Sequence, residues 1–130
     1  MAGPAKIVMK RCHAGRFGYA NRSTYATTKR ALIALAETLA LELGDDGIRV
    51  NTIAPGAVSG PRMDGVLRAR AAATGRDLND VLTDALGIQS IKRFADPQDI
   101  AALAVFLAGE HATTITGQTF AIDGGAKAPQ

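Results

Sequence analysis

Tyr25 and Lys29 stand four residues apart, at the start of a segment with a helical pattern. Residues at this spacing lie one turn apart on the same side of a helix. A phenol has an ordinary pKa of about 10, and a neighbouring ammonium group lowers that pKa because it favours the phenolate. Such a pair could give a proton to a developing alkoxide or remove one from an alcohol. The same spacing also occurs where a packed ring lies beside a solvated lysine, so the surrounding sequence has to support the interpretation.

The helix that would carry this pair is predicted over residues 24–43. We expect Ser23 to be its N-cap and Gly44 to follow its last residue in a left-handed turn. Apolar residues recur at spacings of three and four and give the helix one apolar face. They are Leu32, Leu35, Ala36, Leu39 and Leu43.

Three short apolar runs predict strands, over residues 5–9, 48–54 and 119–122. The first two flank the helix, so residues 5–54 have the order of a parallel strand–helix–strand unit. Turns are predicted at residues 45–47, at Pro55-Gly56 and at residues 123–125.

The second half of the chain is predicted to be mainly helical. Residues 64–73 and 78–86 indicate two short helices broken at Thr74-Gly75. Asp96-Pro97 is typical of a helix start, with a capping carboxylate and a proline in the first turn, and that helix is expected to end near Gly109. The sequence therefore predicts an α/β domain with a three-stranded parallel sheet and helices on its faces.

The composition excludes several classes of function. Of the 130 residues, 47% are hydrophobic and 21% charged, and the net charge of +3 comes from scattered basic residues. A nucleic-acid-binding protein usually gathers its lysines and arginines on one face, so we expect no nucleic-acid partner. No run reaches the roughly 20 apolar residues of a membrane span, and the first residues do not resemble a signal peptide. The single cysteine fits a reducing cytoplasm, and His13 and His111 are isolated, so no metal site is expected.

Three stretches together resemble the short-chain dehydrogenase/reductase family. They are residues 25–32 (Tyr-Ala-Thr-Thr-Lys-Arg-Ala-Leu), 48–56 (Ile-Arg-Val-Asn-Thr-Ile-Ala-Pro-Gly) and 117–125 (Gly-Gln-Thr-Phe-Ala-Ile-Asp-Gly-Gly). The resemblance covers about residues 5–126 and is nearest to the bacterial group with 3-oxoacyl-(acyl-carrier-protein) reductases and related sugar or polyol dehydrogenases. It implies the C-terminal half of a doubly wound, Rossmann-like sheet, divided into 5–60 (strand–helix–strand), 61–90 (a substrate lid) and 96–126 (the final helix and strand).

The resemblance also implies an activity and roles for residues. The activity is NAD- or NADP-dependent hydride transfer to or from a small carbonyl or alcohol substrate, usually in a homo-oligomer whose contacts include residues 24–43 and 97–123. Tyr25 would be the general acid/base, and Lys29 would lower its pKa and bind the hydroxyls of the nicotinamide ribose.

Four residues after the second predicted strand would bind the cofactor. Pro55 and Gly56 would lie against the nicotinamide ring, the backbone of Val58 would bind the carboxamide, and Ser59 would approach the cofactor. Without the resemblance, Pro55-Gly56 would be interpreted only as a turn, and Asn51 as a residue whose side chain hydrogen-bonds at a strand end.

The sequence departs from the family at two places. The family usually has a serine thirteen positions before its tyrosine, and Cys12 stands there; a thiol is the weaker hydrogen-bond donor. The glycine-rich turn that binds the pyrophosphate is missing from the 130 residues. We therefore expect a truncated domain whose first strand forms a sheet edge with apolar surface, prone to association. The alternative function is that of a catalytically incompetent, self-associating module.

Overall fold

The computed structural model describes residues 5–10 and 21–126. In chain order the elements are β1 (Lys6–Lys10), α1 (Ser23–Glu42), β2 (Arg49–Pro55), α2 (Pro61–Thr74), α3 (Leu78–Gly87), α4 (Pro97–Ala108), the 3₁₀ turn η2 (Glu110–Ala112) and β3 (Thr119–Ile122). The predicted strands and helices are confirmed, with bounds that shift by up to three residues. Within the described ranges, no helix combines the length and the apolar character that crossing a membrane would require.

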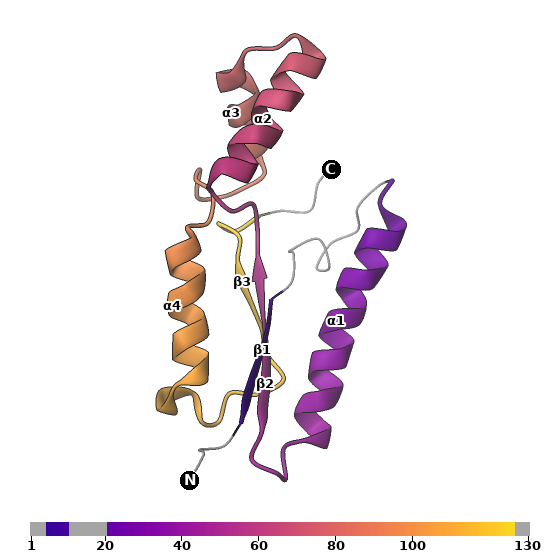
Figure 1. Ribbon diagram of the computed structural model, residues 1–130, viewed down its shortest axis with the longest axis vertical. Coiled ribbons are helices and arrows are strands. Elements are labelled where there is room, and N and C mark those ends of the chain that lie inside the picture. The colour runs from indigo at the N-terminus through magenta and orange to yellow at the C-terminus, as the bar shows by residue number, and fades with distance from the viewer. Residues whose placement is uncertain (1–4, 11–20, 127–130) are drawn as a thin grey trace.

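The three strands form one parallel sheet with β2 in the middle. Ile7 of β1 lies opposite Val50, and Ile53 lies opposite Phe120 of β3. Helix α1 covers one face of the sheet and α4 covers the other, whereas α2 and α3 project beyond the carboxyl ends of the strands (Figure 1). This arrangement confirms the predicted α/β class.

Strand β2 supplies the core on both faces, because successive side chains of a strand point to opposite sides. Val50 packs with Ala36 and Ala40 of α1, and the small alanines allow the helix to lie close to the strand. On the other face Ile53 packs with Ile100 and Leu107 of α4. Burying a side chain such as isoleucine or leucine stabilises a fold by about 1.5–3 kcal/mol, so these two clusters hold both helices on the sheet.

Both predicted ends of α1 are wrong in detail. The N-cap residue is Arg22, not Ser23, and no side chain caps the first turn. Gly44 is not left-handed; Gly47 is, with a φ of 70°. After Leu43 the chain continues through one more turn, in which the Gly47 N–H donates to the Gly44 carbonyl at 2.9 Å. The residue with a positive φ is therefore Gly47, two residues before β2.

Helix α4 is fixed at both ends by side chains. At its start the Asp96 carboxylate accepts a hydrogen bond from the Gln98 N–H at 2.8 Å, as the capping sequence predicts. At its end the Arg49 guanidinium of β2, only 8% exposed, donates to the carbonyls of Leu107 at 2.7 Å and Gly109 at 3.1 Å. A cation is favourable at the negative end of the helix dipole, so Arg49 ties α4 to the sheet.

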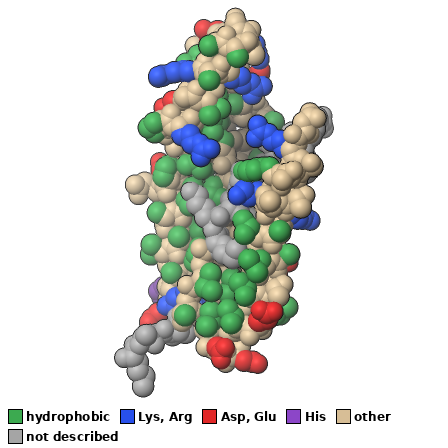
Figure 2. Space-filling view, turned by 45° about the vertical axis from the view of Figure 1, so that its right-hand side comes forward, with side chains coloured by type: hydrophobic (Ala, Val, Ile, Leu, Met, Phe, Trp, Pro, Cys, Tyr) green, Lys and Arg blue, Asp and Glu red, His purple; other side chains and the backbone are tan. Residues whose placement is uncertain are grey.

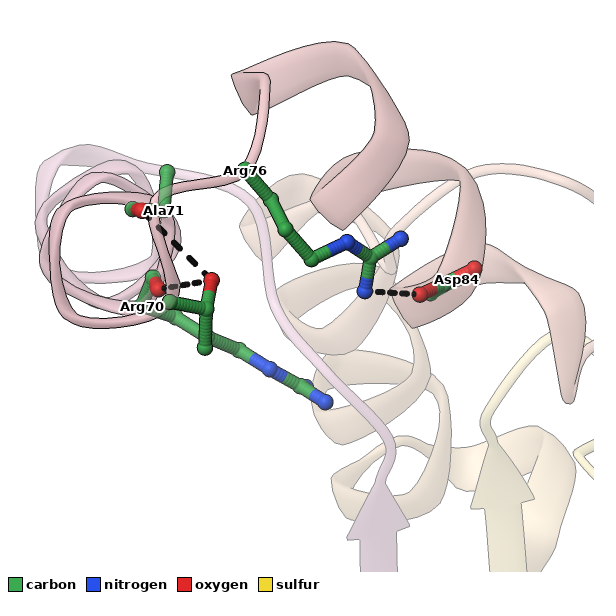
Figure 3. Close-up of polar contacts among 5 residues, drawn as sticks. Arg70, Ala71, Arg76 and Asp84 are labelled. Atoms are coloured by element: carbon green, nitrogen blue, oxygen red, sulfur yellow. Dashed lines mark hydrogen bonds and ion pairs between the residues drawn. The ribbon is translucent and has the colours of Figure 1, made fainter.

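Helices α2 and α3 form a hairpin closed by polar contacts (Figure 3). Arg76, in the connection, donates to the Asp84 carboxylate of α3 at 2.6 Å, and this hydrogen bond raises the pKa of Arg76. The Thr74 hydroxyl donates back to the Arg70 carbonyl at 2.7 Å in the last turn of α2, and the helix ends at Gly75, which has a φ of 64°. The hairpin comprises residues 61–87 and so includes most of residues 61–90, which the sequence analysis assigns to a substrate lid.

Candidate active site

Helix α1 begins at the carboxyl edge of the sheet, where β2 ends (Figure 1). Tyr25 lies in the first turn of α1 and is 39% exposed. The Lys29 ammonium lies over its ring, with Nζ 5.4 Å from the ring centroid. This is the distance of a cation–π contact. The two side chains therefore meet at the edge of a parallel sheet where enzymes of this architecture bind ligands.

The end of β2 lies tightly against the end of β3. Pro55 is buried, and the Gly56 N–H donates to the Ile122 carbonyl at 2.8 Å. A Cβ added to Gly56 would stand 2.9 Å from the Cα of Asp123, closer than two non-bonded carbon atoms approach each other. Position 56 therefore has to be glycine for the two strand ends to meet.

Val58 and Ser59 lie in a short bridge that joins the two segments on either side of the α2–α3 hairpin. The Ala95 N–H donates to the Ala57 carbonyl at 2.8 Å, and the Ser59 N–H donates to the Ala95 carbonyl at 2.9 Å. This bridge uses neither peptide group of Val58, while the Val58 side chain packs on the core beside Ile53. The Ser59 hydroxyl lies 3.3 Å from the Ala95 carbonyl oxygen.

The structure brings the predicted residues together in two groups. Tyr25 and Lys29 form one group on α1, and residues 55–59 form the other, with Ala95 and the turn after β3. Both groups lie at the same edge of the sheet because α1 starts there and β2 stops there (Figure 1). Cys12, the other predicted site residue, lies outside the described residues.

Two further residues have structural roles, Asp123 beside this edge and Asn51 nearer the start of β2. The Asp123 carboxylate is 7% exposed and accepts from the Gly125 N–H at 3.0 Å, so it shapes the turn against which Gly56 packs. Sequence reasoning missed this contact, although Asp-x-Gly is typical of such side-chain turns. Asn51 is a hydrogen-bonding residue as predicted, with its amide nitrogen 2.7 Å from the Ile115 carbonyl, but it lies within β2 and not at a strand end.

A hollow of about 560 Å³ lies at the opposite, amino edge of the sheet. Lys6, Arg49, Glu110 and Thr113 are among its lining residues. Arg49 already donates to the carbonyls at the end of α4, so its guanidinium serves the fold. None of the predicted site residues lines this hollow. Among residues 5–10 and 21–126, no three His, Cys, Asp or Glu side chains are grouped so that they could hold a metal ion.

The donors at the carboxyl edge fit one end of a dinucleotide. An ammonium and a phenol suit the hydroxyls of a ribose, and a backbone N–H and C=O pair suits a carboxamide. Lys29, Tyr25 and Val58 are the residues here with those groups. No strand–glycine-rich turn–helix for a pyrophosphate occurs among the described elements. The described residues thus include the kinds of groups that a ribose and a carboxamide bind, but no pyrophosphate-binding turn.

Comparisons with known proteins show that the chain is similar to reductases and dehydrogenases. The sequence model of a family described as enoyl-(acyl carrier protein) reductase matches residues 1–127. The short-chain reductase protein NovJ of Streptomyces niveus is 39% identical over 108 residues, which are 83% of this chain and 40% of NovJ.

Two solved structures share the fold over nearly the whole chain. An NAD⁺-bound xylitol dehydrogenase has a TM-score of 0.80 and 32% identity, and the match covers 92% of this chain and 48% of that one. A variant of actinorhodin polyketide ketoreductase with NADPH has a TM-score of 0.83 and 25% identity, over 95% and 47% of the two chains. The chain therefore spans about half the length of these structures and two fifths of NovJ.

Proposed function

Because the chain belongs to the short-chain dehydrogenase/reductase family, we propose that its carboxyl-edge site serves hydride transfer between a nicotinamide cofactor and a carbonyl or alcohol substrate. The observation that carries the proposal is the Lys29 ammonium over the Tyr25 ring, 5.4 Å from its centroid, on an exposed helix start. This pair combines a proton donor with a fixed positive charge.

In the proposed reduction Tyr25 is the general acid. Its hydroxyl gives a proton to the carbonyl oxygen of the substrate as negative charge develops there, and it takes the proton back in the reverse direction. The Lys29 ammonium stabilises the phenolate that Tyr25 becomes. When bound, the nicotinamide supplies or accepts the hydride. The peptide groups of Val58 and the packed turn at Pro55-Gly56 orient its ring.

The cofactor is proposed to be NAD or NADP. The xylitol dehydrogenase structure holds NAD⁺ and the ketoreductase structure holds NADPH, so relatives of this chain use both forms. The choice between them depends on contacts with the adenosine ribose, which none of the residues discussed above would make. The proposed substrate is a small carbonyl or alcohol compound, handled in the cytoplasm.

Cofactor binding and turnover of the 130-residue chain test the proposal. NADH and NADPH are titrated while cofactor fluorescence is followed, and turnover is measured with NADPH and ethyl acetoacetate, a small β-keto ester. Tyr25→Phe should lower kcat by about 10²- to 10⁴-fold, the usual contribution of a general acid.

Thr28→Val is the matched control. It removes a hydroxyl from the same helical turn, one that donates to the Tyr25 carbonyl at 2.9 Å, and leaves the phenol in place. Its kcat should stay within threefold of the parent value. If Tyr25→Phe turned over the keto ester as fast as Thr28→Val, Tyr25 would not be the acid. Absence of cofactor binding up to millimolar concentration would favour the second candidate.

The second candidate is a non-catalytic module that associates with copies of itself. Large apolar side chains are exposed on both outer helices, including Leu41 of α1 at 85% and Val105 of α4 at 72%. Hydrophobic side chains also cover much of the middle and lower part of one face of the molecule (Figure 2). Exposed apolar surface of this kind is typical of interaction sites. Sedimentation velocity across a concentration series would show whether the chain associates. Whether or not it does, the cofactor titration separates the two functions, because only the oxidoreductase binds NADH or NADPH.

A further inference from the structure

The lid hairpin is attached to the rest of the molecule by two short connections. Helices α2 and α3 stand beyond the carboxyl edge of the sheet, away from α1 and α4 (Figure 1). Leu67 of α2 and Val81 of α3 are buried in this hairpin. One connection is residues 56–60 and the other is residues 88–96, so the orientation of the lid depends on what holds these two segments.

Each connection has backbone hydrogen bonds near the end of β3, and in the first connection the Gly56 N–H donates to the Ile122 carbonyl at 2.8 Å. The bridge between Val58 and Ala95 joins the connections to each other. In the second connection the Ile91 N–H donates to the Gly124 carbonyl at 2.9 Å, and the Ser90 N–H donates to the Gly125 carbonyl at 3.3 Å. Since the Gly124-Gly125 turn directly follows β3, these bonds attach the lid to the sheet.

Gln89 lies at the centre of this attachment and is only 4% exposed. In the orientation that satisfies its hydrogen bonds, its side-chain amide nitrogen donates to the carbonyls of Arg93 at 2.7 Å and Ile91 at 3.1 Å. These bonds close the loop from 89 to 93. The same end of the amide packs against Gly124, where an added Cβ would stand 2.9 Å from it.

The same loop is also joined firmly to α3. The Lys92 ammonium donates to the Gly87 carbonyl at 2.9 Å and to the Gln89 carbonyl. A lysine that binds the last carbonyls of a helix satisfies groups that would otherwise lack partners and complements the helix dipole. A movement of the loop would therefore move α3 with it.

We propose that Gln89 is a positioning residue for the lid. Its amide holds the loop 89–93 in the shape that pairs with the Gly124-Gly125 turn, and this pairing sets the angle at which the α2–α3 hairpin stands over residues 55–59. The inference depends on the proposed function only for what the lid covers, since the attachment itself is tested without cofactor or substrate.

The first test removes the two donated hydrogen bonds and keeps the volume of the side chain. Gln89→Met is compared with the parent chain, with Gln98→Met as the control because Gln98 is exposed at the start of α4. Peptide-resolved hydrogen exchange should become about tenfold faster over residues 88–95 in Gln89→Met, while the β2 peptide changes less than twofold. An unchanged rate over 88–95, or an equal acceleration over β2, would overturn the proposal.

The second test measures position directly. Spin labels are placed at Thr83→Cys in α3 and Thr113→Cys beside η2, in a Cys12→Ser background, and the distance distribution is recorded by pulsed EPR. Gln89→Met should broaden this distribution, because the hairpin then samples several angles, and Gln98→Met should leave it narrow. A narrow, unshifted distribution in Gln89→Met would show that Gln89 only stabilises its own loop and does not position the lid.

Discussion

Replacement of Gly56 by alanine should loosen the junction between the ends of β2 and β3. The added Cβ would stand 2.9 Å from the Cα of Asp123 and 3.0 Å from its Cβ. Carbon atoms prefer a separation of about 3.5–4.0 Å, so the two segments would have to move apart by about 0.6 Å or more. The nearest atom belongs to the backbone, so a change of side-chain rotamer cannot relieve the contact. Gly56 does not have a positive φ, so the effect is one of crowding.

The expected loss of stability is about 2 kcal/mol. Overpacking of this kind costs about 1–3 kcal/mol. A shift of that size would stretch the bond between the Gly56 N–H and the Ile122 carbonyl, now 2.8 Å, and lose about 1 kcal/mol more. Alanine reduces the entropy of the unfolded chain, which returns about 0.4–1 kcal/mol.

Urea unfolding at 25 °C measures this change, with Gly65→Ala as the matched control. Gly65 lies inside α2, and a Cβ there would have no atom within 4 Å. The same substitution should therefore stabilise the chain by about 0.5–1 kcal/mol, because glycine is a poor helix former. Opposite signs for the two variants are expected. If Gly56→Ala unfolded at the urea concentration of the parent or above it, the close approach to Asp123 would not be a real constraint.

Two further substitutions test how α4 and α1 are held. Arg49→Met should lower the free energy of unfolding, measured with urea, by about 3 kcal/mol, because the carbonyls of Leu107 and Gly109 lose their charged donor. The variant no longer has to bury a guanidinium, and this offsets part of the loss. A change below 1 kcal/mol would mean that Arg49 does not tie α4 to the sheet. Arg22→Asp should raise stability by about 1 kcal/mol, because it gives α1 the capping side chain that its first turn lacks. Equal thermal midpoints of this variant and the parent would contradict that reasoning.

Most of the fold could be predicted from short stretches of sequence. The last strand follows its apolar run residue for residue, and α4 begins where Asp96-Pro97 predicts a start. These features depend on neighbours a few residues away, so local propensity is enough to find them. The predicted ends of α1 were wrong because they too were inferred from local sequence alone. Ser23 and Gly44 suit cap positions by type, but the path of the chain into β2 decides which glycine takes the left-handed conformation.

The candidate site was predictable only as separate pieces. The spacing of Tyr25 and Lys29 placed both on one side of a helix, and the contact of the ammonium with the ring agrees with that placement. Their roles in catalysis stay a prediction, as do those of Pro55, Val58 and Ser59. Sequence reasoning predicted the two short helices of residues 61–90, but it gave no role to Gln89 and described residues 123–125 only as a turn.

The sequence by itself determined the elements, the family and the residues with the chemistry for proton transfer. Tertiary structure decided which distant backbones touch: Gly56 against Asp123, Gln89 against Gly124, and Arg49 against the end of α4. The physical reason is that helix and strand formation depends on bonds between near neighbours in the chain, whereas close packing depends on the three-dimensional path that brings remote segments within 3 to 4 Å.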